Sequence, residues 1–127
     1  PCSTLFRSGN MGRGLVTAPK IYVRDSGICH ALLGIETLND LMGHPVVGGS
    51  WEGFVIENIV SALPPSAAYG YYRTTGGAEV DLVIELGAGE LWAVEIKSST
   101  APSVSRGFHS ACEDLRPTRK FVVHSGD

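Results

Sequence analysis

The sequence predicts an α/β domain, and three features support this prediction. A helical segment with a broad apolar face runs from Ser50 to Leu63, and three strand-like segments, a second helical segment and a last short strand follow it. Two of the strands, between Ala78 and Lys97, alternate apolar and polar residues as half-buried strands do. A short loop containing glycine separates these two strands, which favours an antiparallel hairpin.

The bulk properties are those of a single domain. The 127 residues are enough for one hydrophobic core, and no apolar run is long enough to span a bilayer. Because the chain begins with Pro1 rather than Met and stops just after an expected strand, we expect a piece of a longer protein, and the absence of a signal peptide then carries little weight. Residues 1–18 are rich in Gly and Ser and predict a linker or a poorly ordered arm. The folded domain is then expected over residues 19–127.

Cysteine spacing and charge narrow the functional classes. Cys2, Cys29 and Cys112 are far apart and form no CxxC pair, so they predict neither a disulfide framework nor a zinc site. A cytoplasmic location is the expected default. The net charge of −3 excludes a strongly basic nucleic-acid binder. Between residues 25 and 100 the only bases are Arg73 and Lys97, so we expect phosphate contacts from the ends of the chain or from a partner.

Helix-capping residues, and the glycines and prolines that end helices, predict the remaining helices and strands. Asp25 or Ser26 can begin a helix that stops at Gly34, and Ser50 can cap the main helix, which two prolines end. Apolar residues recur at helical spacing from Val104 to Leu115. The other expected elements are a strand at Pro19–Val23, a short helix at Thr37–Met42, a loop at Gly43–Gly49, and strands at Tyr69–Thr74 and Lys120–His124.

The loop at residues 87–89 also predicts the register of the hairpin. Centring the loop on Ala88 sets Leu86 opposite Glu90, Asp81 opposite Glu95, and Glu79 opposite Lys97. Val80, Leu82, Ile84 and Leu86 are expected to share one face. Opposed residues have Cβ atoms about 4.5–5.5 Å apart, so the Glu79–Lys97 pair is favourable and the Asp81–Glu95 pair is not.

Two interpretations of the acidic pair remain open. A cation between Asp81 and Glu95 would remove their repulsion, and carboxylates without nearby thiolate or imidazole suit a hard ion such as Mg²⁺. Alternatively, one carboxylate leans into solvent or is protonated. Lys97, two residues beyond Glu95, strengthens the functional interpretation.

Glu52 is a further candidate on the main helix. At about 100° per residue it lies within the apolar face formed by Trp51, Val55, Ile56, Ile59, Val60, Ala62 and Leu63, whereas Glu57 lies on the opposite side. An inward carboxylate is costly unless it is paired, hydrogen-bonded or bound to a metal. A salt bridge or a hydrogen bond to a loop would satisfy it as well as a functional role would.

The order of elements and the acidic residues resemble the PD-(D/E)XK nuclease superfamily. The matching residues are Glu52, Asp81 and the Glu95-Ile96-Lys97 motif, with Val80 in the place of the family's proline. The segments PKIYVRDSGICHALLGI, HPVVGGSWEGFVIENIV, YYRTTGGAEVDLVIE and AVEIK resemble the C-terminal domain of unknown function in bacterial AAA-type ATP-binding proteins. The resemblance covers Pro19 to the end of the chain.

The resemblance implies a fold and a chemistry. The fold would be a restriction-endonuclease-like core, with a mixed sheet flanked by helices. Asp81 and Glu95 would be the principal Mg²⁺ or Mn²⁺ ligands, Glu52 an outer ligand and Lys97 the catalytic cation, with Arg73 and Tyr72 as substrate contacts. ATP would bind only in an attached ATPase part, because no GxxxxGK[ST] motif occurs in this chain.

Two classes of function follow from the resemblance. The first is a metal-dependent nuclease domain that hydrolyses phosphodiester bonds in DNA beside its ATPase. The second is a non-catalytic domain that binds a partner or nucleic acid, or regulates the ATPase. The complete set of Glu52, Asp81, Glu95 and Lys97 favours the first, and the acidic middle of the chain favours the second.

Overall fold

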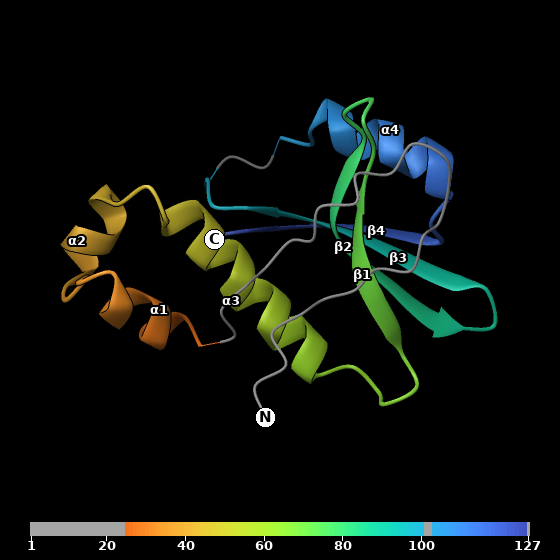
Figure 1. Ribbon diagram of the computed structural model, residues 1–127. Helices are drawn as coiled ribbons and strands as arrows, with labels where there is room; N and C mark the ends of the chain where they lie inside the picture. Colours follow the sequence, from red (N-terminus) through yellow and green to blue (C-terminus); the bar gives the residue numbers. More distant parts are fainter. Residues whose placement is uncertain (1–24, 101–102, 127) are drawn as a thin grey trace.

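The structure, a computed structural model, describes residues 25–100 and 103–126. The arm expected at 1–18 and the strand expected at Pro19–Val23 lie outside the described residues. The elements follow the predicted order (Figure 1). They are α1 (Ser26–Leu32), α2 (Leu38–Gly43), α3 (Val47–Ser61), β1 (Ala68–Arg73), β2 (Glu79–Gly87), β3 (Glu90–Lys97), α4 (Arg106–Leu115) and β4 (Arg119–His124).

Within the described part of the chain, four strands form one mixed sheet. Their order is β1-β2-β3-β4, with β4 parallel to β3 and the other neighbours antiparallel. The hairpin register is the predicted one over its centre, where Leu82 lies opposite Val94. It shifts near the loop, where Gly87 instead of Leu86 pairs with Glu90. The coarse prediction of an α/β fold with a mixed sheet is therefore confirmed.

A β-bulge interrupts β2 at the position of Asp81. Gly70 pairs with Val83 and Tyr72 pairs with Val80, so Asp81 and Leu82 together lie opposite one residue of β1. Such an extra residue changes the direction of the side chains beside it. The prediction that Val80 shares a face with Leu82 is therefore wrong.

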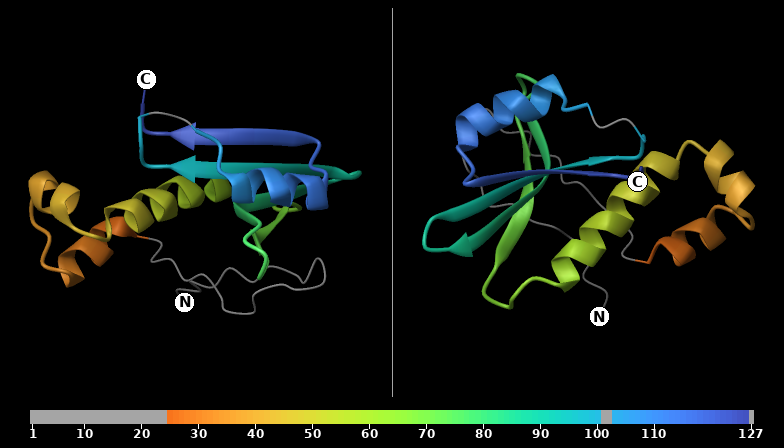
Figure 2. Two further views of the ribbon diagram at one scale, coloured as in Figure 1. Left: turned by 90° about the horizontal axis from the view of Figure 1, so that it is seen from above. Right: turned by 180° about the vertical axis from the view of Figure 1, so that it is seen from behind.

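Helices cover both faces of the sheet (Figure 2). One face packs against α4, and its buried residues are Tyr72, Ala78, Val80, Val83, Ala93, Phe108, Ala111 and Cys112. The other face packs against α3, and its buried residues are Val55, Ile56, Leu82, Ile84, Val94 and Ile96. The alternation of β3 between the two clusters is the one predicted from the sequence.

The start of α3 differs from the prediction. The helix begins at Val47 without a side-chain cap, so Ser50 lies inside it and the loop expected at 43–49 is mostly helical. The hydroxyl of Ser50 is instead hydrogen-bonded to Nε2 of His30 on α1, at 2.6 Å. Contacts with α1 and α2 thus extend α3 through glycines of low helix propensity.

The two short helices before α3 begin where their caps predict. Asp25 accepts a hydrogen bond from the Ile28 N–H, and Thr37 forms a capping box with Asp40. Two apolar residues are more exposed than expected: Ala62 is the C-cap of α3, and Val104 lies before α4.

Candidate functional site

A solvent-open cavity of about 520 Å³ lies at the end of β3, where β1, β2 and the first turn of α4 meet. It brings together residues from five parts of the chain. Its lining residues are Glu52, Arg73, Gly77, Glu79, Asp81, Glu95, Ile96, Lys97, Ser105 and Gly107. All four site residues predicted from the sequence therefore border one space, although they are up to 45 positions apart.

Glu95 is the buried carboxylate of this cavity. Its relative exposure is 4 %, and Lys97 Nζ lies 2.8 Å from its Oε1. The backbone N–H of Ser105 donates to both of its carboxylate oxygens, at 3.3 and 3.2 Å. Ser105 is the N-cap of α4, so the Glu95 carboxylate lies at the positive end of the helix dipole.

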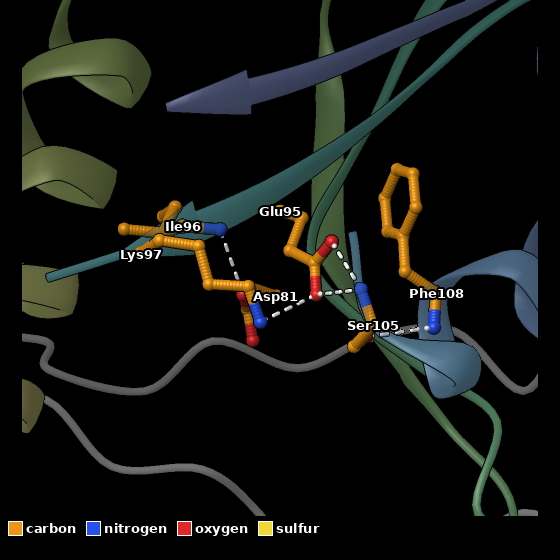
Figure 3. A network of polar contacts seen from close by, with 6 residues as sticks. All are labelled: Asp81, Glu95, Ile96, Lys97, Ser105 and Phe108. Atoms are coloured by element: carbon orange, nitrogen blue, oxygen red, sulfur yellow. Dashed lines mark hydrogen bonds and ion pairs between the residues drawn. The ribbon is translucent and has the colours of Figure 1, made fainter. Parts of the chain in front are cut away.

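Asp81 reaches the cavity from the bulge of β2. Its Oδ2 accepts a hydrogen bond of 2.9 Å from the backbone N–H of Ile96, on the neighbouring strand (Figure 3). The side chains of Asp81, Glu95 and Lys97 point toward a common space in this view. The bulge thus places the Asp81 carboxylate beside the end of β3, where the second acid and the lysine lie.

Glu52 reaches the cavity from α3, which packs on the opposite face of the sheet from α4. The indole N–H of the adjacent Trp51 donates to the carbonyl oxygen of Lys97 at 2.9 Å, which ties α3 to the end of β3. Glu52 borders the cavity and Glu57 does not. Both glutamates are half-buried, so the expected contrast, with Glu57 in open solvent, is not found.

The predicted Glu79–Lys97 pair is wrong. Lys97 forms its ion pair with Glu95 on its own strand, while Glu79 pairs with Arg73 across the hairpin of β1 and β2, at 2.7 Å. The physical reason is that the β2–β3 backbone pairing ends at Leu82. The Asp81 side chain, just before it, accepts a hydrogen bond from the Ile96 backbone N–H on β3.

Tyr72 does not border the cavity, so the structure gives no support to its expected role as a substrate contact. Its hydroxyl donates to Asp114 on α4 at 3.1 Å, and its ring is buried beneath that helix. Burial, together with the hydrogen bond to Asp114, raises the pKa of Tyr72 above its ordinary value. Tyr72 therefore anchors the last turn of α4 to β1.

Sequence reasoning missed the contribution of α4 to the site. Gly107 borders the cavity, and a Cβ at this position would lie 2.7 Å from the carbonyl oxygen of Gly77. A side chain there would force the helix away from the β1–β2 turn. The signal available in the sequence was Ser105 followed by Gly107, which fits an N-cap and a close backbone approach.

The donor set of the cavity suits a hard cation. Four carboxylates and two cations border it, which gives a formal charge of −2. Among residues 25–100 and 103–126, however, no three His, Cys, Asp or Glu side chains lie close enough to hold a metal ion together. Mg²⁺ commonly keeps several waters and takes only one or two protein carboxylates. The residues present therefore fit a two-carboxylate site formed by Asp81 and Glu95.

Comparison with known proteins gives the family. A model of a domain of unknown function, DUF4143, matches residues 47–127, which cover α3, the whole sheet and α4. The chain belongs to the DUF4143 family. No solved structure matches this chain. The family match includes every residue that borders the cavity.

Two bacterial relatives are similar to this DUF4143 chain over most of its length. They are the uncharacterized proteins Mb2031c of Mycobacterium bovis and Rv2008c of Mycobacterium tuberculosis. Each is 43 % identical over 118 residues, which is 93 % of this chain and 26 % of the relative. This chain thus spans about a quarter of the length of these relatives. None of the helices described here is long and apolar enough to cross a membrane.

Proposed function

We propose that this DUF4143 domain is a PD-(D/E)XK-type nuclease domain that hydrolyses phosphodiester bonds in DNA with the help of Mg²⁺ or Mn²⁺. The observation that carries the proposal is the arrangement of Asp81, Glu95 and Lys97 around one solvent-open cavity. Two carboxylates and an ammonium group within one polar cavity are the groups that metal-assisted phosphodiester cleavage requires.

Each residue has a distinct part in this proposal. Asp81 and Glu95 would hold the cation, with Glu52 on α3 as an outer ligand. The bound cation would polarise the scissile phosphate and activate a water molecule. Lys97 would donate from Nζ to the oxygen on which negative charge develops, and the backbone N–H of Ser105 at the start of α4 orients the Glu95 carboxylate.

The larger protein enters the proposal as the source of DNA contacts. Acidic residues outnumber basic ones at the cavity, so the domain alone cannot gather a polyanion by neutralising many phosphates. The relatives are about four times as long as the matched segment. We infer that an attached AAA-type ATPase part, as the resemblance implies, supplies these contacts and binds ATP.

A non-catalytic role is the second candidate, and one observation favours it. Glu95 already has a cation and a backbone N–H as partners, so this buried carboxylate is satisfied without a metal. In that case the domain binds a partner or nucleic acid, or regulates the ATPase, and Asp81 and Glu95 serve the fold alone.

Cleavage assays separate the two candidates. The complete polypeptide and the 127-residue chain are incubated at low salt with linear duplex and single-stranded DNA, in Mg²⁺ or Mn²⁺ and in EDTA. We expect metal-dependent cleavage by the complete polypeptide, little by the short chain, and none by Asp81→Asn or Lys97→Ala. Circular dichroism verifies that each variant is folded. Equal residual cleavage by wild type and Lys97→Ala would indicate a contaminating nuclease and favour the non-catalytic role.

A further inference from the structure

We propose that Arg73 contacts a phosphate oxygen of the nucleic acid at this cavity, and that Glu79 holds the guanidinium in place for this contact. The inference rests on the proposed function, because it concerns the same cavity. Among the described residues, Arg73 and Lys97 are the two cations that border it. They lie on β1 and β3, the two neighbours of the strand that carries Asp81.

The position of Arg73 is fixed by its neighbour across the hairpin. Arg73 pairs directly with Glu79 in the β1–β2 register. Its Nη2 and Nε donate to the same oxygen, Oε1 of Glu79, at 2.7 and 3.2 Å. The guanidinium is thereby held at the mouth of the cavity by a carboxylate that borders the same space.

The turn that follows Arg73 is held by several hydrogen bonds. Thr74 accepts from the backbone N–H of Ala78 through its Oγ1 and donates its own backbone N–H to the Ala78 carbonyl. The N–H of Gly77 donates to the Thr74 carbonyl at 3.1 Å, and the first turn of α4 abuts Gly77 through Gly107. The end of β1 therefore has little freedom to carry Arg73 away from the cavity.

The exposure of the two ion pairs at the cavity indicates which cation can exchange its carboxylate for a phosphate. The Lys97–Glu95 pair involves a carboxylate with 5 % of its side chain exposed, whereas both side chains of the Arg73–Glu79 pair are 38 % exposed. An ion pair in contact with solvent contributes little to stability, so a phosphate oxygen can join or displace Glu79 at low cost. A guanidinium also presents a planar fork of donors that matches phosphate oxygens. Arg73 is therefore the cation suited to receive the substrate.

The alternative is that Arg73 and Glu79 form an ordinary cross-strand pair at the surface. That alternative predicts that their substitution changes stability alone. A phosphate contact predicts a change in the salt dependence of binding, because each neutralised phosphate releases condensed counterions. The salt dependence therefore distinguishes the two roles.

The test measures fluorescence anisotropy of labelled single-stranded and duplex oligonucleotides with the complete polypeptide in Ca²⁺, over a series of salt concentrations. We expect Arg73→Ala to weaken binding about tenfold and to reduce the salt slope by about one. Arg73→Lys should keep the slope and lose a few-fold in affinity. Arg119→Ala is the matched control, because Arg119 is an exposed arginine that does not border the cavity. It should change neither quantity.

Glu79→Gln supplies a test in the opposite direction. The amide can still accept from Arg73 but carries no charge, so oligonucleotide binding should become tighter by a few-fold. A gain that persists in the double variant Glu79→Gln/Arg73→Ala would come from the lost negative charge alone and would count against the contact. If Arg73→Ala does not fold, Glu79→Gln and Arg73→Lys are the variants that test the proposal.

The outcomes separate this inference from the proposed function when cleavage in Mg²⁺ is measured on the same samples. One outcome is that wild type cleaves DNA while Arg73→Ala keeps the same salt slope of binding. This would overturn the role of Arg73 but not the nuclease proposal. A reduced slope without cleavage supports the phosphate contact and counts against hydrolysis. Failure of the wild-type polypeptide to bind either oligonucleotide would overturn both.

Discussion

Lys97 Nζ lies 2.8 Å from Oε1 of Glu95, two residues earlier on the same strand, and Glu95 is almost completely buried. A buried carboxylate that loses its cation is left without adequate compensation. This relationship means that Lys97 supports the fold as well as the proposed chemistry. The cleavage assay with Lys97→Ala therefore needs a stability measurement of the same variant beside it.

Lys97→Ala should lower the free energy of unfolding by about 1–3 kcal/mol, less than for a fully buried pair because the lysine is partly exposed. Urea titration followed by circular dichroism measures the loss. The control is the double variant with Glu95→Gln, which removes both charges. Its unfolding free energy should fall by less than the two single losses combined. Additive losses would show that the two side chains are not energetically coupled.

Gly107→Ala should destabilise the domain by about 1–3 kcal/mol, because the added Cβ would overpack the contact with the Gly77 carbonyl. Gly49→Ala is the matched control, since Gly49 also lies in a helix and a Cβ there meets nothing within 4 Å. The control should be neutral or stabilising by up to about 1 kcal/mol. Thermal unfolding measures both. Similar melting temperatures for the two variants would contradict the close packing of α4 on the turn.

Tyr72→Phe should lower the free energy of unfolding by about 1 kcal/mol, because it removes the hydrogen bond to Asp114. The pKa of Tyr72 is raised in the folded state, so the unfolded state loses this proton first as the pH rises. Wild-type stability should therefore fall above the ordinary tyrosine pKa of about 10. Denaturant titration above this pH should show a smaller fall for Tyr72→Phe. An equal pH dependence in both proteins would contradict the raised pKa.

The order of the elements and the centre of the hairpin register could be predicted because both depend on local patterns. Alternation in β3 gives its two faces, and prolines mark the end of α3. The start of α3 could not be predicted, because the contact of Ser50 with His30 is tertiary. The bulge at Asp81 was also missed, because nothing in the alternation of β2 marks an extra residue.

Four of the residues that border the cavity were named from the sequence, but their hydrogen-bond and ion-pair partners were not. Short spacing placed Glu95 and Lys97 on one strand face, and helical phase placed Glu52 toward the sheet. The predicted partner of Glu79 was wrong because Glu79 has a neighbour on each side of β2, and the loop at 87–89 specifies only the neighbour on β3. The role of Ser105 depends on how α4 returns to the sheet, which periodicity does not specify.

We propose that Asp81 and Glu95 bind a divalent cation in the native state. A ligand of the native state alone stabilises it by mass action, by about 2.7 kcal/mol at one hundred times its dissociation constant. The direct measurement is the melting temperature of the wild-type chain with increasing Mn²⁺ or Mg²⁺, beside Asp81→Asn and Glu85→Gln. Glu85 is an exposed carboxylate on the same strand that does not border the cavity.

We expect the melting temperature to rise by several degrees in wild type and in Glu85→Gln, and the rise to be lost in Asp81→Asn. Isothermal titration calorimetry with Mn²⁺ should show binding by the same two proteins. A wild-type melting temperature unchanged by millimolar Mn²⁺, or an equal rise in Asp81→Asn, would contradict a metal site at this cavity.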